Sequence, residues 1–193
     1  MAPSHCTDLH PRDGTKLLDI ARESIGSGLR HGRALDVAAE ALAGALAAPR
    51  GVFVTLTRRQ ALRGCIGSME SSEPLAQGVA DSAFGAAFRD PRFPQLQAHE
   101  FADTHIEISI LSPMEPLAAA SREKLLEALE PGVDGLLLEE HHHRSTFLPK
   151  VWEQLPEPEL FLDHLMAKAG LPGDYWSPTL RFRRYTSTSI AED

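Results

Sequence analysis

The sequence has little of several features that would narrow the class of protein. Its 193 residues include two cysteines, Cys6 and Cys65, so no disulfide framework is expected and a reducing compartment is favoured. No stretch approaches the roughly 18 apolar residues of a membrane-spanning helix. Residues 1–14 lack the apolar core of a secretory signal. We therefore expect a cytoplasmic protein with no membrane partner.

Positive charge is also scarce. Lysine and arginine number 19 against 27 aspartate and glutamate residues, which gives a formal net charge of −8. Because nucleic acids attract positively charged surfaces, this balance argues against a nucleic-acid partner. The sequence has no GxxxxGK[ST], GxGxxG, HExxH or GxSxG pattern, so nucleotide binding, zinc proteolysis and serine hydrolysis lose their usual motifs.

Apolar periodicity predicts helices and strands in alternation. Helices are expected at 15–31, 35–46, 74–88 and 157–169, with a short one after Ser121. Strands are expected at 51–57, 61–68, 104–111, 133–139, 145–149 and 180–186. Tight hairpins connect two pairs of these strands, which predicts an α+β fold with a mainly antiparallel or mixed sheet and flanking helices.

The two ends of the chain lack this periodicity. We expect residues 1–13 to form a disordered N-terminal tail, because they mix proline, histidine and charge. Residues 14–187 are predicted to form the folded domain. Residues 188–193 are expected to be a C-terminal tail.

The segment LRGCIG at 62–67 is the most informative motif. Gly64 and Gly67 flank Cys65, and glycine weakens a strand unless something approaches its backbone closely. Strand alternation places Arg63 and Cys65 on one side, where a guanidinium favours the thiolate that attacks electrophiles and binds metals. Cys65 is thus a candidate nucleophile, ligand or substrate contact. Alternatively it is a small buried hydrophobic residue, as most free cysteines are.

The polar side of the regular strand at 104–111 carries a carboxylate, Glu107. If this strand lies near the cysteine strand, Glu107 is a candidate to orient Arg63 or to act as a general base. Cys65, Arg63 and Glu107 are therefore the candidate catalytic residues. The alternative is an Arg63–Glu107 ion pair that only sets the strand register.

Three consecutive histidines, His141, His142 and His143, resemble a metal-binding tract. Consecutive side chains at a hairpin tip diverge, however, and no nearby cysteine or carboxylate pattern completes a site. We expect solvated turn residues here and no metal. In the loop DPRFPQL, Asp90 is expected to bond local backbone amides, and Arg92 could line a cleft.

Six segments in order closely resemble the AMMECR-domain family, whose bacterial and archaeal members are called protein A of the AmmeMemoRadiSam system. They are GVFVTLTRRQALRGCIGS, AAFRDPRFPQL, IEISILSP, GVDGLLLE, TFLPKVWEQLP and FLDHLMAKAGLP. The resemblance covers roughly Leu17 to Tyr185 and implies two lobes, a larger one from both chain ends and a smaller one from a middle segment.

The family's LRGCIG and DPRF motifs fall on Leu62–Gly67 and Asp90–Phe93 of this sequence. The resemblance therefore makes five residues candidates for a substrate or partner cleft: Gly64, Gly67, Asp90, Arg92 and Phe93. It also implies a Memo-like protein, related to non-haem iron dioxygenases, and a radical-SAM protein as partners.

The resemblance brings no settled reaction and the cofactor is unknown, so whether the chain is an enzyme stays open, as does homo-oligomerisation. Two functions stay open. The chain is a component of an AmmeMemoRadiSam system with Cys65-dependent chemistry, or it is a non-catalytic adaptor or substrate-presenting module in which Cys65 is structural.

Overall fold

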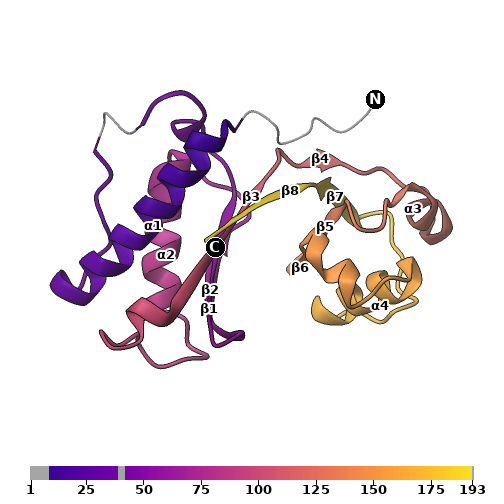
Figure 1. Cartoon of the computed structure of the whole chain (residues 1–193). Helices are drawn as coiled ribbons and strands as arrows, with labels where there is room; N and C mark the ends of the chain where they lie inside the picture. Colours follow the sequence, from indigo (N-terminus) through magenta and orange to yellow (C-terminus); the bar gives the residue numbers. More distant parts are fainter. Residues whose placement is uncertain (1–8, 39–41, 193) are drawn as a thin grey trace. The chain divides into compact units, whose positions relative to one another are not determined.

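A computed structural model describes residues 9–38 and 42–192 of the chain. These residues form two compact units (Figure 1). The larger unit takes its described residues from Cys6–Leu111 and Thr188–Asp193, and the described part of the smaller unit is Ser112–Ser187. Each unit combines helices with a four-stranded sheet, so the predicted α+β class is confirmed.

The larger unit is a sheet with two helices packed on one face. The helices are α1, Pro11–His31, and α2, Leu75–Phe88. The strands are β1, Val52–Arg58; β2, Ala61–Ser68; β3, Thr104–Leu111; and β8, Ser187–Ala191. Their order is β2-β1-β3-β8, and β1 pairs antiparallel with both β2 and β3. Strand β2 therefore lies at an edge of the sheet.

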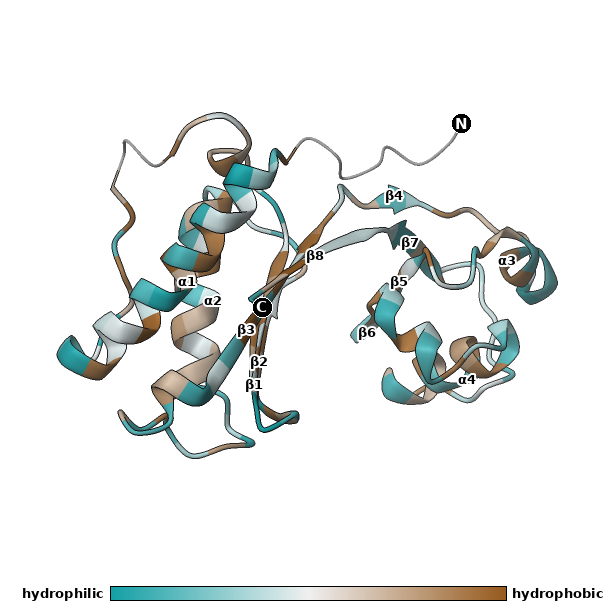
Figure 2. Ribbon diagram, viewed as in Figure 1, coloured by the Kyte–Doolittle hydropathy of each residue, from teal (hydrophilic) through white to brown (hydrophobic). Residues whose placement is uncertain are grey.

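Alternation of apolar and polar residues in the strands decides which face is buried. Val54 of β1 and Ile108 of β3 are fully buried and belong to one core cluster with residues of both helices. Helix α1 alternates between hydrophilic and hydrophobic colours in Figure 2, as expected of a helix with one apolar side. Thr55 and Glu107 lie on the opposite side of the sheet, which we call the polar face.

The first hairpin has the geometry that its sequence predicts. Strands β1 and β2 are joined by Arg59 and Gln60, whose φ angles are 52° and 64°. Two central residues with positive φ are typical of the turns that match the twist of paired strands. The predicted strands at 51–57 and 61–68 are confirmed.

Helix α1 begins earlier than predicted. It starts at Pro11, and the His10 side chain accepts a hydrogen bond from the Arg12 amide while Asp13 accepts one from the His10 amide. Proline at the first helical position and this reciprocal cap stabilise the start of the helix. The expected disorder is therefore wrong for residues 11–13, and residues 1–8 of that tail lie outside the described residues.

The helix expected at 35–46 is wrong for the described residues of that range, 35–38 and 42–46. They contain only a short 3₁₀ turn at Gly44–Leu46. The Leu35 amide donates to Ser24 Oγ of α1, and the Val37 amide donates to Gln77 Oε1 of α2. These amides therefore bond to side chains of neighbouring helices. Residues 39–41 of the expected helix lie outside the described residues.

The expected C-terminal tail is also wrong, because Ser187–Ala191 form strand β8 beside β3. Glu192, which directly follows this strand, is anchored as well. Glu192 Oε1 accepts a hydrogen bond from Arg22 at 3.0 Å, and its Oε2 accepts one from the Ile106 amide at 2.9 Å. Side-chain periodicity over so few residues did not reveal the strand.

The smaller unit has its own sheet and core. Its strands are β4, Glu115–Pro116; β5, Gly135–Glu140; β6, His143–Phe147; and β7, Arg181–Tyr185, in the order β4-β7-β5-β6. Its helices are α3, Arg122–Ala128, and α4, Pro158–Lys168. Trp152 and Phe161 stack with ring centroids 3.8 Å apart in the core. The expected Ser121 cap of α3 is confirmed.

The glycines that flank Cys65 lie close to the backbone of neighbouring elements, Gly64 to helix α2 and Gly67 to strand β1. A Cβ atom on Gly64 would lie 2.0 Å from the Ala86 carbonyl oxygen of α2. A Cβ atom on Gly67 would lie 2.2 Å from the Val52 carbonyl oxygen of β1. Both positions therefore require glycine for packing, which is the close backbone approach that such residues indicate.

We expect Gly64→Ala to destabilise the protein by about 3 kcal/mol, because the new methyl group would overlap a backbone carbonyl. A lower midpoint in urea denaturation measures this change. Gly26→Ala in α1 is the matched control, since its Cβ would meet only the flexible end of Arg30, at 3.1 Å. The control should change the stability by no more than about 1 kcal/mol. Equal stability of Gly64→Ala and the parent chain would contradict the close approach.

Candidate functional site

The backbone of Cys65 is held by the loop that follows α2. The Cys65 amide donates to Asp90 Oδ2 at 2.9 Å, and the Cys65 carbonyl oxygen accepts from Arg92 Nη2 at 3.2 Å. Edge strands leave such groups without partners, and β2 is an edge strand. Asp90 and Arg92 thus form what we call the edge cap, which satisfies both backbone groups of Cys65.

The edge cap is a tightly bonded ion pair. Asp90 is 5% exposed and accepts hydrogen bonds from three nitrogen atoms of Arg92: the amide at 3.1 Å, Nε at 2.9 Å and Nη2 at 2.7 Å. The first is the local backbone bond expected of Asp90. The Arg92 guanidinium, helped by the Cys65 amide, holds the pKa of Asp90 well below its ordinary value despite burial. Asp90 is therefore ionised at neutral pH.

The Cys65 thiol lies on the polar face, directly opposite Thr55 of β1. The Thr55 hydroxyl donates to Cys65 Sγ at 3.4 Å. The Arg92 guanidinium lies on the same residue, at the Cys65 carbonyl oxygen, 3.2 Å from Nη2.

Arg63 is not the cation beside Cys65, contrary to the sequence-based expectation. The pairing of β1 with β2 shifts between Leu56 and Thr57. This shift leaves Arg63 as the extra residue of a β-bulge. A bulge interrupts the strict alternation on which the expectation depended, and it directs Arg63 to a different partner.

That partner is Glu100, and the alternative Arg63–Glu107 ion pair is therefore wrong. Arg63 Nε lies 3.1 Å from Glu100 Oε1, and its Nη2 lies 2.9 Å from Oε2. Glu107 lies opposite Thr55 in β3, so β1 separates it from β2 by two strand spacings, roughly 10 Å. Thr55, and not Glu107, is the direct neighbour of the thiol.

Glu100 is the ionisable residue at this site that the sequence did not reveal. It is 9% exposed and also accepts hydrogen bonds from Arg58 at 3.2 Å and from the Gln97 amide at 2.9 Å. Arg63 is the main cause that lowers the pKa of Glu100 to about 2. Glu100 precedes β3 in a segment without periodicity, so no pattern marked it.

Phe93 completes the surroundings of the edge cap. Its ring centroid lies 5.5 Å from the Arg92 guanidinium carbon, within cation–π range. The Arg92 side chain is 55% exposed, so part of the guanidinium is accessible beside Cys65. Gly64 and Gly67 lie next to Cys65 as packing residues. A substrate or partner cleft at these residues stays a prediction.

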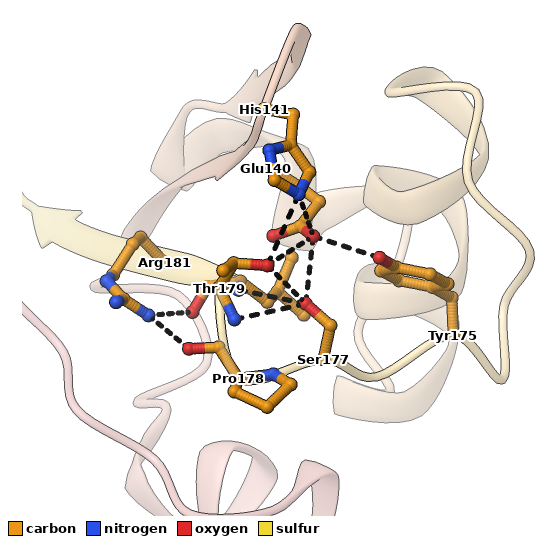
Figure 3. A network of polar contacts seen from close by, with 8 residues as sticks. Glu140, His141, Tyr175, Ser177, Pro178, Thr179 and Arg181 are labelled. Carbon is orange, nitrogen blue, oxygen red and sulfur yellow. Dashed lines mark hydrogen bonds and ion pairs between the residues drawn. The ribbon is translucent and has the colours of Figure 1, made fainter.

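The smaller unit contains a separate polar network around Glu140 (Figure 3). Glu140 is 1% exposed, and its Oε1 accepts hydrogen bonds from three hydroxyl groups. These are Tyr175 at 2.9 Å, Ser177 at 2.8 Å and Thr179 at 2.7 Å. Burial alone raises the pKa of Glu140, but the hydroxyl donors outweigh it and lower that pKa. The network fastens the loop before β7 to the end of β5.

The three histidines adjoin this network without converging. His141 Nε2 lies 3.4 Å from Glu140 Oε1 (Figure 3), whereas His143 Nδ1 lies 2.7 Å from the Ala169 carbonyl oxygen. The rings of His142 and His143 lie 4.2 Å apart between centroids. Across the part of the chain that the structure describes, no group of three or more histidine, cysteine, aspartate or glutamate side chains could hold a metal ion.

Fold and site together define an α+β protein of two units. The sheet of its larger unit carries a cysteine whose backbone is held by the edge cap. Similar proteins exist among archaea. A relative from Methanothermobacter thermautotrophicus is 37% identical over 183 residues, covering 94% of this chain and 95% of the relative. A relative from Aeropyrum pernix is 38% identical over 179 residues, covering 90% of this chain and 76% of the relative.

A solved structure resembles the fold. The crystal structure of the uncharacterized protein PH0010 from Pyrococcus horikoshii matches with a TM-score of 0.87 and 30% identity, covering 96% of this chain and 94% of that one. The AMMECR1 family model matches residues 18–190. The chain belongs to the AMMECR1 family, as the sequence resemblance indicated. Among the described helices, none is long and apolar enough to cross a membrane.

We expect Glu100→Gln to destabilise the protein by about 3 kcal/mol near neutral pH, because Arg63 would lose its charged partner and Arg58 would keep only Asp103, at 3.5 Å. The folded-state pKa of about 2 lies below the ordinary value of 4.5. The stabilisation by this carboxylate is therefore complete above about pH 4.5 and is lost as the pH falls towards 2. Urea denaturation of the parent and of Glu100→Gln measures the free energy of unfolding of each. The difference between the two should become smaller as the pH falls from about 4.5 towards 2.

Glu73→Gln serves as the control, because Glu73 is exposed and its carboxylate has no ion pair among the described residues. It should leave the free energy of unfolding nearly unchanged. A difference between parent and Glu100→Gln that stays constant from about pH 6 to about pH 2.5 would refute the importance of this ion pair.

Proposed function

We propose that the chain is a thiol-dependent component of a multiprotein system, in which Cys65 reacts with an electrophilic substrate. One observation carries the proposal. The edge cap places Asp90 on the Cys65 amide and the Arg92 guanidinium on the Cys65 carbonyl oxygen, while the sulfur accepts a hydrogen bond from the Thr55 hydroxyl. A cysteine that only fills a core needs neither a cation nor a hydroxyl donor.

The chemistry that this arrangement supports is addition to a carbonyl-type carbon. The Cys65 thiol releases its proton to water, and the sulfur lone pair forms the new sulfur–carbon bond. The π electrons of the carbonyl group move to its oxygen, which then takes a proton from water. The accessible part of Arg92 can donate a hydrogen bond to that oxygen as its negative charge develops. This step needs no oxidant or reductant.

We further propose that the partners are a Memo-like protein and a radical-SAM protein, and that the chain works in the cytoplasm as the A component of such a system. Membership in the AMMECR1 family over residues 18–190 supports the choice of partners. The presence of only two cysteines in 193 residues supports a reducing compartment.

The first test is alkylation of Cys65 by iodoacetamide in a Cys6→Ala background, followed by mass spectrometry. We expect the folded protein to react, and Arg92→Gln to slow the reaction by up to about tenfold, because the edge cap loses the guanidinium that holds the Cys65 carbonyl oxygen. Arg59→Gln, an exposed arginine of the same hairpin, is the control and should react at the parent rate. Reaction only after unfolding, or at an unchanged rate in Arg92→Gln, would contradict the proposal.

The second test uses the chain together with a Memo-like protein and a radical-SAM protein. Mass spectrometry would follow the small molecules of a cell extract supplied to the three proteins. We expect Cys65→Ser to reduce their conversion by about a hundredfold or more, whereas Cys6→Ser should not change it. Conversion by Cys65→Ser at the parent rate would refute a chemical role for the thiol.

A non-catalytic adaptor is the second candidate, and a different observation favours it. Gly64 and Gly67 are explained by packing, and Arg63 is explained by its ion pair with Glu100. The adaptor alternative predicts unchanged conversion by Cys65→Ser together with copurification of the chain with at least one of the two partners. Loss of conversion with intact copurification would refute it.

A further inference from the structure

The smaller unit contains a pocket of about 70 Å³ that the proposed function does not use. Its walls come from β4, β7 and the turn before β5, and they include three ionisable residues: Glu115, Asp134 and Arg184. At about 30 Å³ per molecule of liquid water, the volume corresponds to a few waters. It therefore suits a small polar head group and is far too small for a nucleotide.

The cation of this pocket, Arg184, has no ion-pair partner among the described residues. Arg184 is half-buried, and within the described chain its guanidinium makes neither a hydrogen bond nor an ion pair. Its neighbour Arg183, by contrast, pairs with Glu139 at 3.0 Å. A partly buried guanidinium gains most from an anion that matches its planar set of donors.

One acidic residue of the pocket lies directly across from this cation. Glu115 is the register partner of Arg184 in the β4–β7 pair, yet the two side chains do not form an ion pair. The carboxylate of Glu115 has no hydrogen bond among the described residues either. The Glu115 carboxylate and the Arg184 guanidinium therefore both line the pocket, and neither has a hydrogen-bond or ion-pair partner among the described residues.

The second acidic residue is buried and half satisfied. Asp134 is 1% exposed, and its Oδ2 accepts a hydrogen bond from the Glu130 amide at 2.9 Å, whereas its Oδ1 has no partner among the described residues. Its main-chain carbonyl oxygen accepts from Trp152 Nε1 at 2.7 Å, which fixes its position. Burial raises the pKa of Asp134, and the charge of Arg184 opposes that rise. A cationic donor at Oδ1 would satisfy this carboxylate.

We infer that this pocket binds an α-amino-acid head group, with the carboxylate on Arg184 and the ammonium group between Asp134 and Glu115. A ligand carrying only an anion would face two unmatched carboxylates. A ligand carrying only a cation would leave Arg184 without a partner. A zwitterion matches both signs of charge, and its head group fits the volume.

Titration of the full chain, followed by amide NMR, tests the inference with four probes. Glycine presents the head group alone, L-norleucine adds an aliphatic chain, and acetate and ethylamine each carry one of the two charges. We expect glycine to shift the Ser112 and Thr186 amides, which belong to pocket residues, and both single-charge probes to bind about tenfold more weakly or worse.

The two amino acids distinguish the sources of the head group. Binding of glycine alone assigns a free small amino acid, and binding of both assigns the head group of a longer molecule whose chain leaves the pocket. If neither amino acid shifts these amides, the inference is wrong. It is also wrong if acetate or ethylamine binds as tightly as glycine.

Variants then connect binding to the charges. Arg184→Gln and Asp134→Asn should each weaken glycine binding about tenfold or more, and asparagine keeps an oxygen that can accept from the Glu130 amide. Arg181→Gln on the same strand is the matched control, because Arg181 is exposed and bonds to the Pro178 carbonyl oxygen outside the pocket. An unchanged glycine affinity in Arg184→Gln, with the folded amide spectrum retained, overturns the inference.

Discussion

The Asp90 carboxylate is the group on which the arrangement around the thiol depends. It binds the Cys65 amide and the Arg92 guanidinium at the same time, so one buried charge fixes a strand, a loop and a cation relative to one another. Because Asp90 is 5% exposed, removal of its partners would leave an uncompensated buried charge. The geometry at the sulfur is therefore maintained by bonds to the backbone and not by the thiol itself.

Close packing imposes a second constraint on the same strand. Helix α2 presses its backbone against Gly64, and the loop that leaves α2 supplies Asp90 and Arg92. The position of α2 therefore sets the distance between the loop that follows it and strand β2, which Asp90 and Arg92 cap. A side chain at Gly64 would move the helix and the loop together, so the glycines and the DPRF segment work as one structural unit.

Local patterns predicted most of the secondary structure, because burial on one side leaves a period in the sequence. Strand β3 and the first hairpin are clear examples. Contacts between distant segments leave no such period. Glu100 lies 37 residues after Arg63, and the bulge at Arg63 arises from strand pairing. The local backbone bond of Asp90 was therefore predicted correctly, whereas the partner of Arg63 was not.

Strand β8 gives the larger unit an unusual dependence on the order of synthesis. Residues 187–191 complete its sheet only after the whole smaller unit has been added to the chain, and Glu192 then bonds both Arg22 and the Ile106 amide. On a ribosome, the larger sheet must wait with β3 exposed at one edge while the smaller unit is made. Long-range pairing of this kind slows folding, so β8 is the last strand to join this sheet.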